Sequence, residues 1–452
     1  MASESPHHAV YTQDRQNPPS NLLSVPTIQR KDPCLRCRNI DLDNIFSRER
    51  AADLHRYGTS IVTDLEVYIV DLRNSVCPLC RLFGSVAFRN PVSDSERSKA
   101  SATCHLATHR RLEIFASTPY RDTFTRNIFL ISIVEAPDLY NAPELDQLRH
   151  ETGFLSLIST AQPGQTISVN QICPELYDVK FAKDCLTRCR NAHDHFCDAL
   201  DTESFPSFRL IDCSLRKVVP APPKAKCIAL PYVWGPPVPA ASGDGSGTQP
   251  LSDLDNWPKI ITDSARVALN LGIQYLWVDK YCINQRDEYD RAFQIGHMDK
   301  IYTNAEVTLI AAAGEGPHYG LPGVSGTFCK AQPALRIGDH HIVSTLRSGT
   351  KLVHESKWAT RGWTYQEGIL SRRRLIFTDE QVFWECNNMH CTEAIQIHPD
   401  AELSVEGTRR IFDFRTPGTK SWDIFQYIWE FHRRAYIPKR CTQRSVWNFQ
   451  RL

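Results

Sequence analysis

Three short segments of the chain carry the residue types best suited to chemistry. They are Tyr-Val-Trp-Gly at 232–235, the run at 276–285, and Arg-Gly-Trp-Thr-Tyr-Gln-Glu at 361–367. Together they supply aromatic rings that can stack on a planar ligand and two acidic residues, Asp279 and Glu367, that can stabilise positive charge. Each segment stands at the end of an expected strand or helix, where α/β folds gather functional groups. We therefore predict that the three segments contribute to one site.

Two Cys-x-x-Cys pairs near the start of the chain have the spacing of metal ligands. Cys34 and Cys37 form the first pair, and Cys77 and Cys80 form the second. Four thiolates can hold a tetrahedral zinc ion, which helps to fold a small module that lacks a large core. The interval between the pairs is about twice the usual one, so the intervening chain must form a helix of its own, which the polar segment 42–57 permits. The alternative is four buried thiols that bind nothing.

Other cysteines and histidines are interpreted as structural. Cys104, His105 and His109 lie in an alternating segment typical of a strand, which does not bring them together. Cys282 has no histidine partner close in sequence and is expected to be a buried thiol. Four residues at four-residue intervals share one face of a predicted helix: Cys185, Cys189, His193 and Cys197. Packing of small thiols against a neighbouring element explains this stripe better than a bound metal does, and we assign it no function.

The composition indicates a globular protein. Of its 452 residues, 42% are hydrophobic and 10% aromatic, enough to bury a core and to form about three domains. Its 52 basic and 51 acidic residues leave a net charge of +1, which argues against binding to nucleic acid or to an anionic membrane. No apolar run approaches the roughly 20 residues that span a bilayer. The sixteen cysteines occur without a secretion signal, so we expect reduced thiols and a cytoplasmic protein.

The middle of the chain alternates between predicted strands and helices. Short apolar runs predict strands at 208–212, 226–230, 273–279 and 307–313. Apolar residues at helical spacing predict helices over 262–272, with a Thr262-Asp263 cap, and over 287–304. The glycine-rich stretch within 236–250 lacks a following Lys-Ser/Thr and is predicted to be a plain loop. This alternation implies a parallel sheet with helices and right-handed crossovers, and it places Asp279 at the carboxyl end of a strand.

Four regions are expected along the chain. Residues 1–30 have no apolar core and are predicted to form a disordered arm. Residues 31–200 form a mixed N-terminal region with the Cys-x-x-Cys module. Residues 208–395 form the α/β domain, and 396–452 form a partly helical C-terminal extension.

Several blocks of the α/β region resemble the fungal heterokaryon incompatibility (HET) domain. They are 229–235, 260–302, Gly320-Leu321-Pro322-Gly323 and 361–386, and the resemblance covers roughly 226–391. The upstream segments 186–197 and 209–212 also look like the lead-in found in HET proteins. HET proteins act in self/non-self recognition and trigger programmed cell death when incompatible cells fuse. The resemblance therefore implies a fungal protein in this role, which acts with a protein partner or as a homo-oligomer.

The HET domain is itself similar to TIR domains, which are flavodoxin-like α/β signalling domains. Some TIR domains cleave NAD at the nicotinamide glycosidic bond with a glutamate on a helix shortly after a tryptophan. The matching residues here are Trp363 and Glu367, so the resemblance implies that Glu367 is the catalytic carboxylate. This cleavage needs little acid assistance, and one carboxylate can stabilise its oxocarbenium character. On the same basis Asp279 joins the catalytic set, and the NAD-binding residues are Tyr232, Trp234, Gly235, Asn284, Gln285, Arg361 and Trp363.

Two classes of function stay open from the sequence. As an enzyme, the protein would consume NAD through Glu367. As an interaction module, it would oligomerise or bind a partner, with Asp279 capping a turn and Glu367 paired with Arg361 or with one of the arginines at 372–374. A third class, a DNA-binding regulator that uses the cysteine pairs, is disfavoured by the neutral net charge.

The chain also departs from the HET pattern at several positions. Pro231 stands where HET proteins usually have serine, which removes a hydroxyl and a backbone donor. Lys280-Tyr281 replaces a small and apolar pair, and the match beyond Cys391 is loose. We therefore expect a diverged or truncated member of the family.

Overall fold

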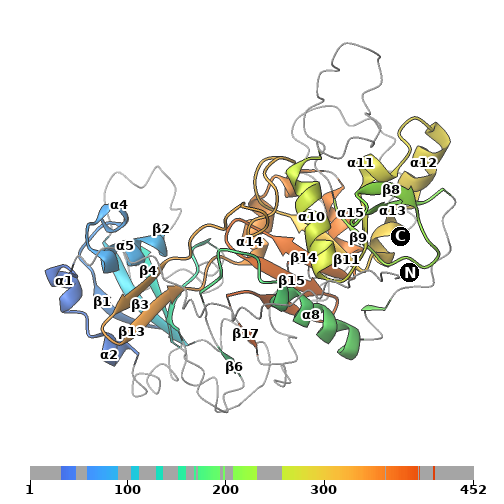
Figure 1. The fold of residues 1–452 in the computed structure, drawn as a ribbon. Helices are drawn as coiled ribbons and strands as arrows, with labels where there is room; N and C mark the ends of the chain where they lie inside the picture. Colours follow the sequence, from blue (N-terminus) through green and yellow to red (C-terminus); the bar gives the residue numbers. More distant parts are fainter. Residues whose placement is uncertain are drawn as a thin grey trace, which may run out of the picture.

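The computed structural model describes residues 32–46, 59–89, 103–110, 129–135, 151–158, 167–168, 172–193, 197–198, 207–231, 257–361, 363–394, 396–397 and 411–412. Two large sheets organise these residues (Figure 1). The predicted arm at 1–30, the loop at 236–250 and most of the predicted C-terminal extension lie outside them. Among the described residues no helix is long and apolar enough to cross a membrane, and every cysteine is free of disulfides.

The first sheet is mainly antiparallel and has the strand order β1-β3-β4-β5-β13-β12, with β2 added to β4 in parallel. Alternate residues of its strands, such as Leu106, Ile131 and Ile133, pack with the helices α4 (Ile69–Asn74) and α5 (Pro78–Ser85). Of the predicted helix over 42–57, the structure describes a single turn, α2 (Leu42–Ile45). The strands are β1 (Thr59–Asp64), β2 (Ala87–Arg89), β3 (Cys104–Arg110), β4 (Phe129–Glu135), β5 (Leu155–Leu157), β12 (Ala334–Ile337) and β13 (His340–Ser344).

The second sheet is mixed and has a parallel centre. Its order is β16-β15-β14-β11-β9-β10-β7-β8. The four strands β14, β11, β9 and β10 run parallel, whereas the strands at both edges pair antiparallel. The prediction of a parallel sheet is therefore right for the centre and wrong for the edges. The strands are β7 (Arg209–Asp212), β8 (Lys217–Pro220), β9 (Cys227–Ala229), β10 (Tyr275–Trp277), β11 (Val307–Ala311), β14 (Arg373–Phe377), β15 (Val382–Cys386) and β16 (His390–Thr392).

The edge strand β8 was not expected from the sequence. The segment between the predicted strands at 208–212 and 226–230 forms a hairpin with β7 rather than a simple turn. Pro220 ends this strand, and proline is tolerated there because an edge strand leaves its outer backbone donors unpaired. The prolines between the two predicted strands are therefore compatible with a strand at the edge of the sheet.

Helices complete the cores around the second sheet. Alternate residues of β11 enter different cores: Leu309 packs in one with residues of α8 (Val179–Ala192) and α10 (Lys259–Asn270), and Ile310 in another with residues of α14 (Gly349–Glu355) and η4 (Trp358–Thr360). The predicted helix over 262–272 is confirmed as α10, but it begins earlier, and Pro258 rather than Thr262 is its N-cap. The predicted helix over 287–304 is split into α12 (Glu288–Gly296) and α13 (Met298–Asn304), because His297 leaves the helical conformation with φ −121°.

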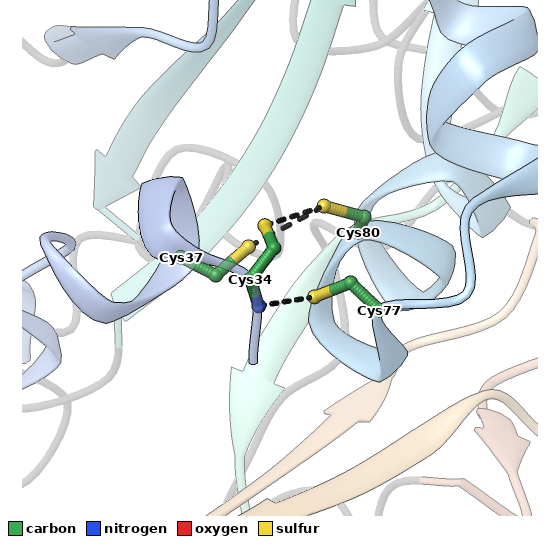
Figure 2. A group of neighbouring side chains, drawn as sticks. All are labelled: Cys34, Cys37, Cys77 and Cys80. Carbon is green, nitrogen blue, oxygen red and sulfur yellow. Dashed lines mark hydrogen bonds between the residues drawn. The ribbon is translucent and has the colours of Figure 1, made fainter. Parts of the chain in front are cut away.

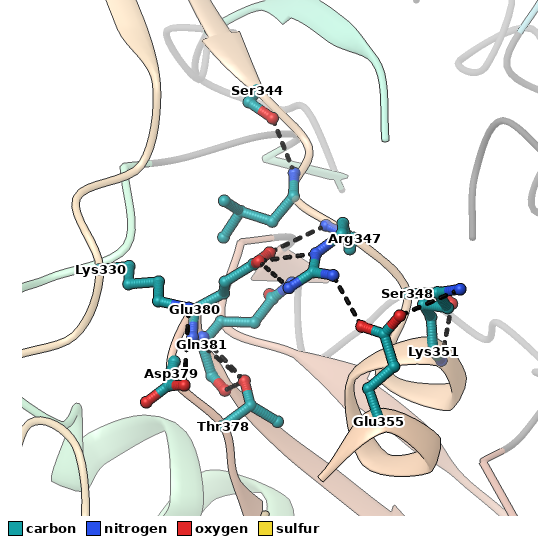
Figure 3. A network of polar contacts seen from close by, with 11 residues as sticks. Lys330, Ser344, Arg347, Ser348, Lys351, Glu355, Thr378, Asp379, Glu380 and Gln381 are labelled. Carbon is teal, nitrogen blue, oxygen red and sulfur yellow. Dashed lines mark hydrogen bonds and ion pairs between the residues drawn. The ribbon is translucent and has the colours of Figure 1, made fainter. Parts of the chain in front are cut away.

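The two sheets share segments of the chain. The hairpin β12–β13 lies between β11 and β14 in sequence, yet it pairs with β5 in the first sheet. Conversely, α8 precedes the second sheet in sequence and packs in its core. A polar network holds the chain where it returns from β13: Arg347 donates to Glu380 (Nε–Oε1 2.7 Å), in the turn between β14 and β15, and to Glu355 of α14 (2.9 Å) (Figure 3). These ion pairs join the hairpin to the second sheet.

Gly320 allows a close contact that anchors the Gly-Leu-Pro-Gly block. The carboxylate of Asp263, in α10, is fully buried and accepts hydrogen bonds from Leu321 N (2.9 Å) and Lys259 Nζ (2.9 Å). A Cβ atom on Gly320 would lie 2.4 Å from Asp263 Oδ2, and the residue has φ +83°. Asp263, predicted as part of a helix cap, is therefore the anchor of this block instead.

We expect Gly320→Ala to destabilise the protein more than Gly326→Ala. Both glycines have φ +83°, but a Cβ on Gly326 meets nothing within 4 Å. The control should lose about 1 kcal/mol from backbone strain, whereas Gly320→Ala adds about 1–3 kcal/mol from the clash with Asp263. Urea unfolding followed by tryptophan fluorescence measures the difference. Equal losses in the two variants would show that Asp263 does not constrain this position.

Candidate functional site

The structure brings Asp279 and Glu367 together around Tyr302. The Glu367 side chain is 1% exposed, and both of its carboxylate oxygens contact the guanidinium of Arg361, at 3.1 and 3.4 Å. The hydroxyl of Tyr302 donates a hydrogen bond to the same carboxylate. Asp279 is close enough for its charge to raise the pKa of both Glu367 and Tyr302. Two acids, one base and one phenol therefore form a single cluster.

Three elements position this cluster. Asp279 opens α11 (Asp279–Cys282), two residues after β10 ends at the fully buried Trp277. Tyr302 lies on α13, and its ring packs edge-on against Trp277 with ring centroids 5.7 Å apart. Glu367 lies on α15 (Thr364–Ile369), whose first residue, Thr364, donates from its hydroxyl to Trp358 O (2.9 Å). The acids are thus fixed by a strand end and by a short anchored helix.

Burial brings the pKa of Glu367 close to physiological pH. Desolvation is the main cause that raises its pKa to about 7, and the charge of Asp279 acts in the same direction. The charge of Arg361 and hydrogen bonds from Arg361 and Tyr302 oppose this rise. A carboxyl group with a pKa near 7 exchanges its proton at physiological pH, a property that is concentrated at functional sites.

The remaining predicted residues of this site are placed as follows. Trp363, two residues after Arg361 in sequence, is 52% exposed. Asn284 and Gln285 hold the turn after α11: Asn284 N donates to Asp290 (3.1 Å), and Gln285 Nε2 donates to the Asp279 carbonyl oxygen (3.1 Å). The structure therefore brings Gln285 to the backbone of Asp279. Tyr232, Trp234 and Gly235 lie outside the described residues.

Tyr302 is the member of the cluster that sequence reasoning missed. It stands within the family-like block at 260–302, but the predicted helix presents Met298, Ile301 and Ala305 as its apolar face. This pattern places Tyr302 beside the apolar face of the helix and predicts no polar role for it. Its hydrogen bond to Glu367 depends on a contact between residues far apart in sequence, which helical spacing does not reveal.

Cys282 is excluded as a nucleophile at this site. It is fully buried, and its sulfur accepts a hydrogen bond from Val278 N (3.3 Å). Burial raises the pKa of the Cys282 thiol to about 12, so the thiolate is not available at neutral pH. The prediction of a buried structural thiol is confirmed.

The two Cys-x-x-Cys pairs converge on one point of the N-terminal lobe, the part of the chain that packs around the first sheet (Figure 2). Cys34 is the N-cap of α1 (Leu35–Arg38) and Cys77 is the N-cap of α5, so each pair places its second cysteine in the first turn of a helix. The sulfur of Cys80 lies 3.4 Å from that of Cys37 and 3.7 Å from that of Cys34. All four sulfurs lie within 4.8 Å of one another.

This arrangement fits a tetrahedral metal ion. Zinc–sulfur bonds of about 2.3 Å place the four sulfurs about 3.8 Å apart, close to the observed separations. The backbone N–H of Cys34 donates to the sulfur of Cys77 (3.3 Å), as expected around thiolate ligands. The hydrogen bond between Cys37 and Cys80 lowers the pKa of the Cys80 thiol and raises that of Cys37, because the two close sulfurs hold a proton between them. The four thiols therefore form a candidate metal centre.

A surface cavity of about 460 Å³ lies along α10, apart from both groups. Its lining includes Trp257, Lys259, Asp263, Arg266, Asn270 and Ser325 and contains neither Asp279 nor Glu367. The Glu367 cluster is thus not part of this cavity.

Comparison with protein families identifies the central part of the chain. Residues 228–367 match the family model described as Heterokaryon incompatibility protein (HET). This segment begins in β9 and ends at Glu367, so it contains Asp279, Tyr302 and Arg361. This part of the chain is therefore similar to the HET family, as the sequence blocks predicted. Neither the curated proteins nor the solved structures give a match to the chain.

We expect Glu367→Gln to change the pH dependence of stability. The pKa of Glu367 rises on folding, from 4.5 to about 7, so the folded state binds the proton more tightly than the unfolded chain does. The contribution of Glu367 to the free energy of unfolding therefore falls as pH increases from about 4.5 to 7. Glutamine mimics the protonated form, so the variant should gain up to about 3 kcal/mol relative to wild type over this window. Urea unfolding at a series of pH values measures the gain.

Glu306→Gln is the control for this measurement. Burial favours the protonated form of Glu306, but Arg190 and Arg373 outweigh it, so its pKa is lowered. Its substitution should therefore cost stability by an amount that stays constant between pH 5 and 8. A constant difference for Glu367→Gln as well would mean that its carboxyl group titrates normally.

We expect Cys80→Ser to remove one zinc ion per chain and to destabilise the N-terminal lobe, because the metal centre loses a ligand. Cys104→Ser is the matched control, because Cys104 is fully buried in the same core but lies outside the cluster. Elemental analysis of the purified proteins measures the metal. Equal zinc content in wild type and Cys80→Ser would assign the four cysteines to packing alone.

Proposed function

We propose that this protein acts in heterokaryon incompatibility and triggers cell death by cleaving NAD at the Glu367 cluster. The HET domain supports the incompatibility role. The observation that carries the enzymatic step is the buried Glu367 carboxyl group, held against Arg361 and Tyr302 with a pKa near 7. The proposal includes a fungal protein, as the family resemblance implies, and a cytoplasmic one, as the expected reduced cysteines predict.

The sheet topology supports a TIR-like arrangement for this role. The four parallel strands follow one another in chain order as β9, β10, β11 and β14, and they stand side by side as β10-β9-β11-β14. This is the order in which flavodoxin-like sheets begin, and such sheets bind ligands beyond the carboxyl ends of their strands. Asp279 follows one of those ends, at β10. The antiparallel strands at the edges are additions to this core.

The proposed chemistry is hydrolysis of the nicotinamide–ribose bond. Nicotinamide leaves with the bonding electron pair, the ribose carbon develops positive charge, and water adds to that carbon and loses a proton. The Glu367 carboxylate would stabilise the positive charge, and Trp363 and Asp279 would contact the nucleotide. Because Glu367 is 1% exposed and Arg361 contacts both of its oxygens, catalysis requires this ion pair to open.

One observation favours a second function, that of a non-enzymatic interaction module. The described contacts engage both oxygens of Glu367, which is also how a structural ion pair would look. In this case the protein would transmit incompatibility by oligomerising or by binding a partner. The cluster would then only hold α15 in place.

Nicotinamide release by the purified full-length chain separates the two functions. If the enzymatic proposal holds, wild type releases nicotinamide, and Glu367→Ala and Glu367→Gln lower the rate at least about 100-fold. Glu393→Gln is the matched control, because Glu393 is also a buried acid whose pKa burial raises to about 7, but it bonds to Val382 N and Asp178 N instead. This control should keep the wild-type rate.

Expression in fungal cells provides the second readout. Under the enzymatic proposal, cell death and loss of NAD disappear together in the Glu367 variants. If folded Glu367 variants still kill while NAD stays constant, the enzymatic proposal is wrong and the interaction module is supported. Wild-type protein that releases no nicotinamide leads to the same conclusion.

A further inference from the structure

A second group of metal-ligating side chains lies where α8 meets the second sheet. Cys189 belongs to the last turn of α8, His193 caps the helix, Cys197 follows shortly after, and Cys386 ends β15. The ligand atoms of these four residues lie within 4.8 Å of one another. Nδ1 of His193 is 3.5 Å from the sulfur of Cys386. Side chains from distant parts of the chain therefore converge on one point.

The spacing of these atoms suits a single tetrahedral ion. Bonds of about 2.3 Å to sulfur and about 2.0 Å to nitrogen place ligand atoms about 3.3–3.8 Å apart around a shared centre. Three thiolates with one imidazole form a common structural zinc set. An iron–sulfur cluster would place its own sulfide ions between the cysteines and hold them further apart.

Burial indicates a structural site rather than a catalytic one. Cys197 and Cys386 are fully buried, and Cys189 is nearly so, while His193 is half-buried. Four protein ligands leave no open position for a substrate, in contrast to catalytic zinc sites, which keep one. The expected role is therefore to fix the positions of the segments that supply the ligands.

The charges around the group also favour an anionic metal centre. Zinc with three thiolates carries a net charge of −1, which a buried site must balance. Nε of Arg373, a side chain that is 4% exposed, lies 3.1 Å from the sulfur of Cys189. Arg372 is buried beside it and donates to the carbonyl oxygen of Cys197. Among the described residues, Arg373 forms an ion pair with one carboxylate, that of Glu306, which Arg190 also contacts, and Arg372 forms none.

We propose that Cys189, His193, Cys197 and Cys386 bind a zinc ion that fastens α8 to the β15–β16 hairpin. The ion closes a link between the segment that leads into the HET domain and the strands that follow its matched region. Arg373 donates to one thiolate and balances the charge of the centre. This site is separate from the Glu367 cluster, so it stands whether or not the protein cleaves NAD.

The structure selects a different ligand set from the one that helical spacing suggests. Cys185, Cys189, His193 and Cys197 form the stripe read from the sequence, but Cys185 hydrogen-bonds with Cys391 and lies outside the group. Cys386 takes its place from a strand nearly 200 residues away along the chain. Cys185 therefore provides a matched control, because it is a buried cysteine on the same helix.

Elemental analysis of the purified full-length chain tests the proposal. Cys386→Ser should contain one zinc ion per chain fewer than wild type, whereas Cys185→Ser should contain the same number as wild type. The proposal is overturned if Cys386→Ser keeps the wild-type zinc content, or if wild type contains no zinc.

X-ray absorption separates ligand loss from unfolding. In Cys80→Ser, which disrupts the N-terminal centre, the remaining zinc should have three sulfur ligands at about 2.3 Å and one nitrogen ligand at about 2.0 Å. This measurement leaves the proposed site intact and so does not depend on the folding of Cys386→Ser. A zinc signal with four sulfurs, a signal with oxygen ligands, or no zinc at all overturns the assignment.

Discussion

Three consecutive arginines on an inner strand impose the strongest constraint on this fold. Arg372 immediately precedes β14 and Arg373 and Arg374 begin it, and all three are at most 5% exposed. Transferring a cation from water into a protein interior costs several kcal/mol unless polar partners surround it. Successive residues of a strand point to opposite faces, so the partners must come from both sides. Arg373 reaches Glu306 and Cys189, while Arg374 reaches Glu385 and the carbonyl oxygens of Gly368 and Ile369.

These partners connect the arginine run to both candidate centres around the second sheet. The contact of Arg373 with Cys189, together with the ion pair between Arg190 and Glu306, holds α8 against the sheet and brings its thiols to Cys386. The contacts of Arg374 hold the carboxyl end of α15, the helix that carries Glu367. One strand of charged residues therefore positions a cysteine group and a carboxylate cluster through different helices.

The sequence predicts the parts of this fold that depend on local pattern. Apolar spacing predicted α10 and three of the four central strands, β9, β10 and β11, and the end of β10 predicted the position of Asp279. The ordered blocks predicted the family. The sequence does not predict features that depend on contacts between residues far apart in the chain. The arginine run gives no sign of burial, because charged residues normally mark an exposed face and their partners lie elsewhere in the chain. For the same reason, the cysteine stripe of α8 suggested Cys185, while only the packing of β15 reveals Cys386.

Glu367 and Glu385 are two buried acids whose pKa values are shifted in opposite directions. Both are buried and both contact an arginine. Burial alone would raise the pKa of Glu385, but the close contact with His390 (Nδ1–Oε2 3.4 Å) and the charge of Arg374 bring it below the ordinary value. For Glu367, Arg361 and Tyr302 do not offset burial and the charge of Asp279, so its pKa stays near 7. The ion pair of Glu385 therefore holds its carboxylate firmly, whereas that of Glu367 stabilises a charge that is easily lost to a proton. A carboxyl group that exchanges its proton near neutral pH is what the proposed site requires, since such groups are concentrated at functional sites.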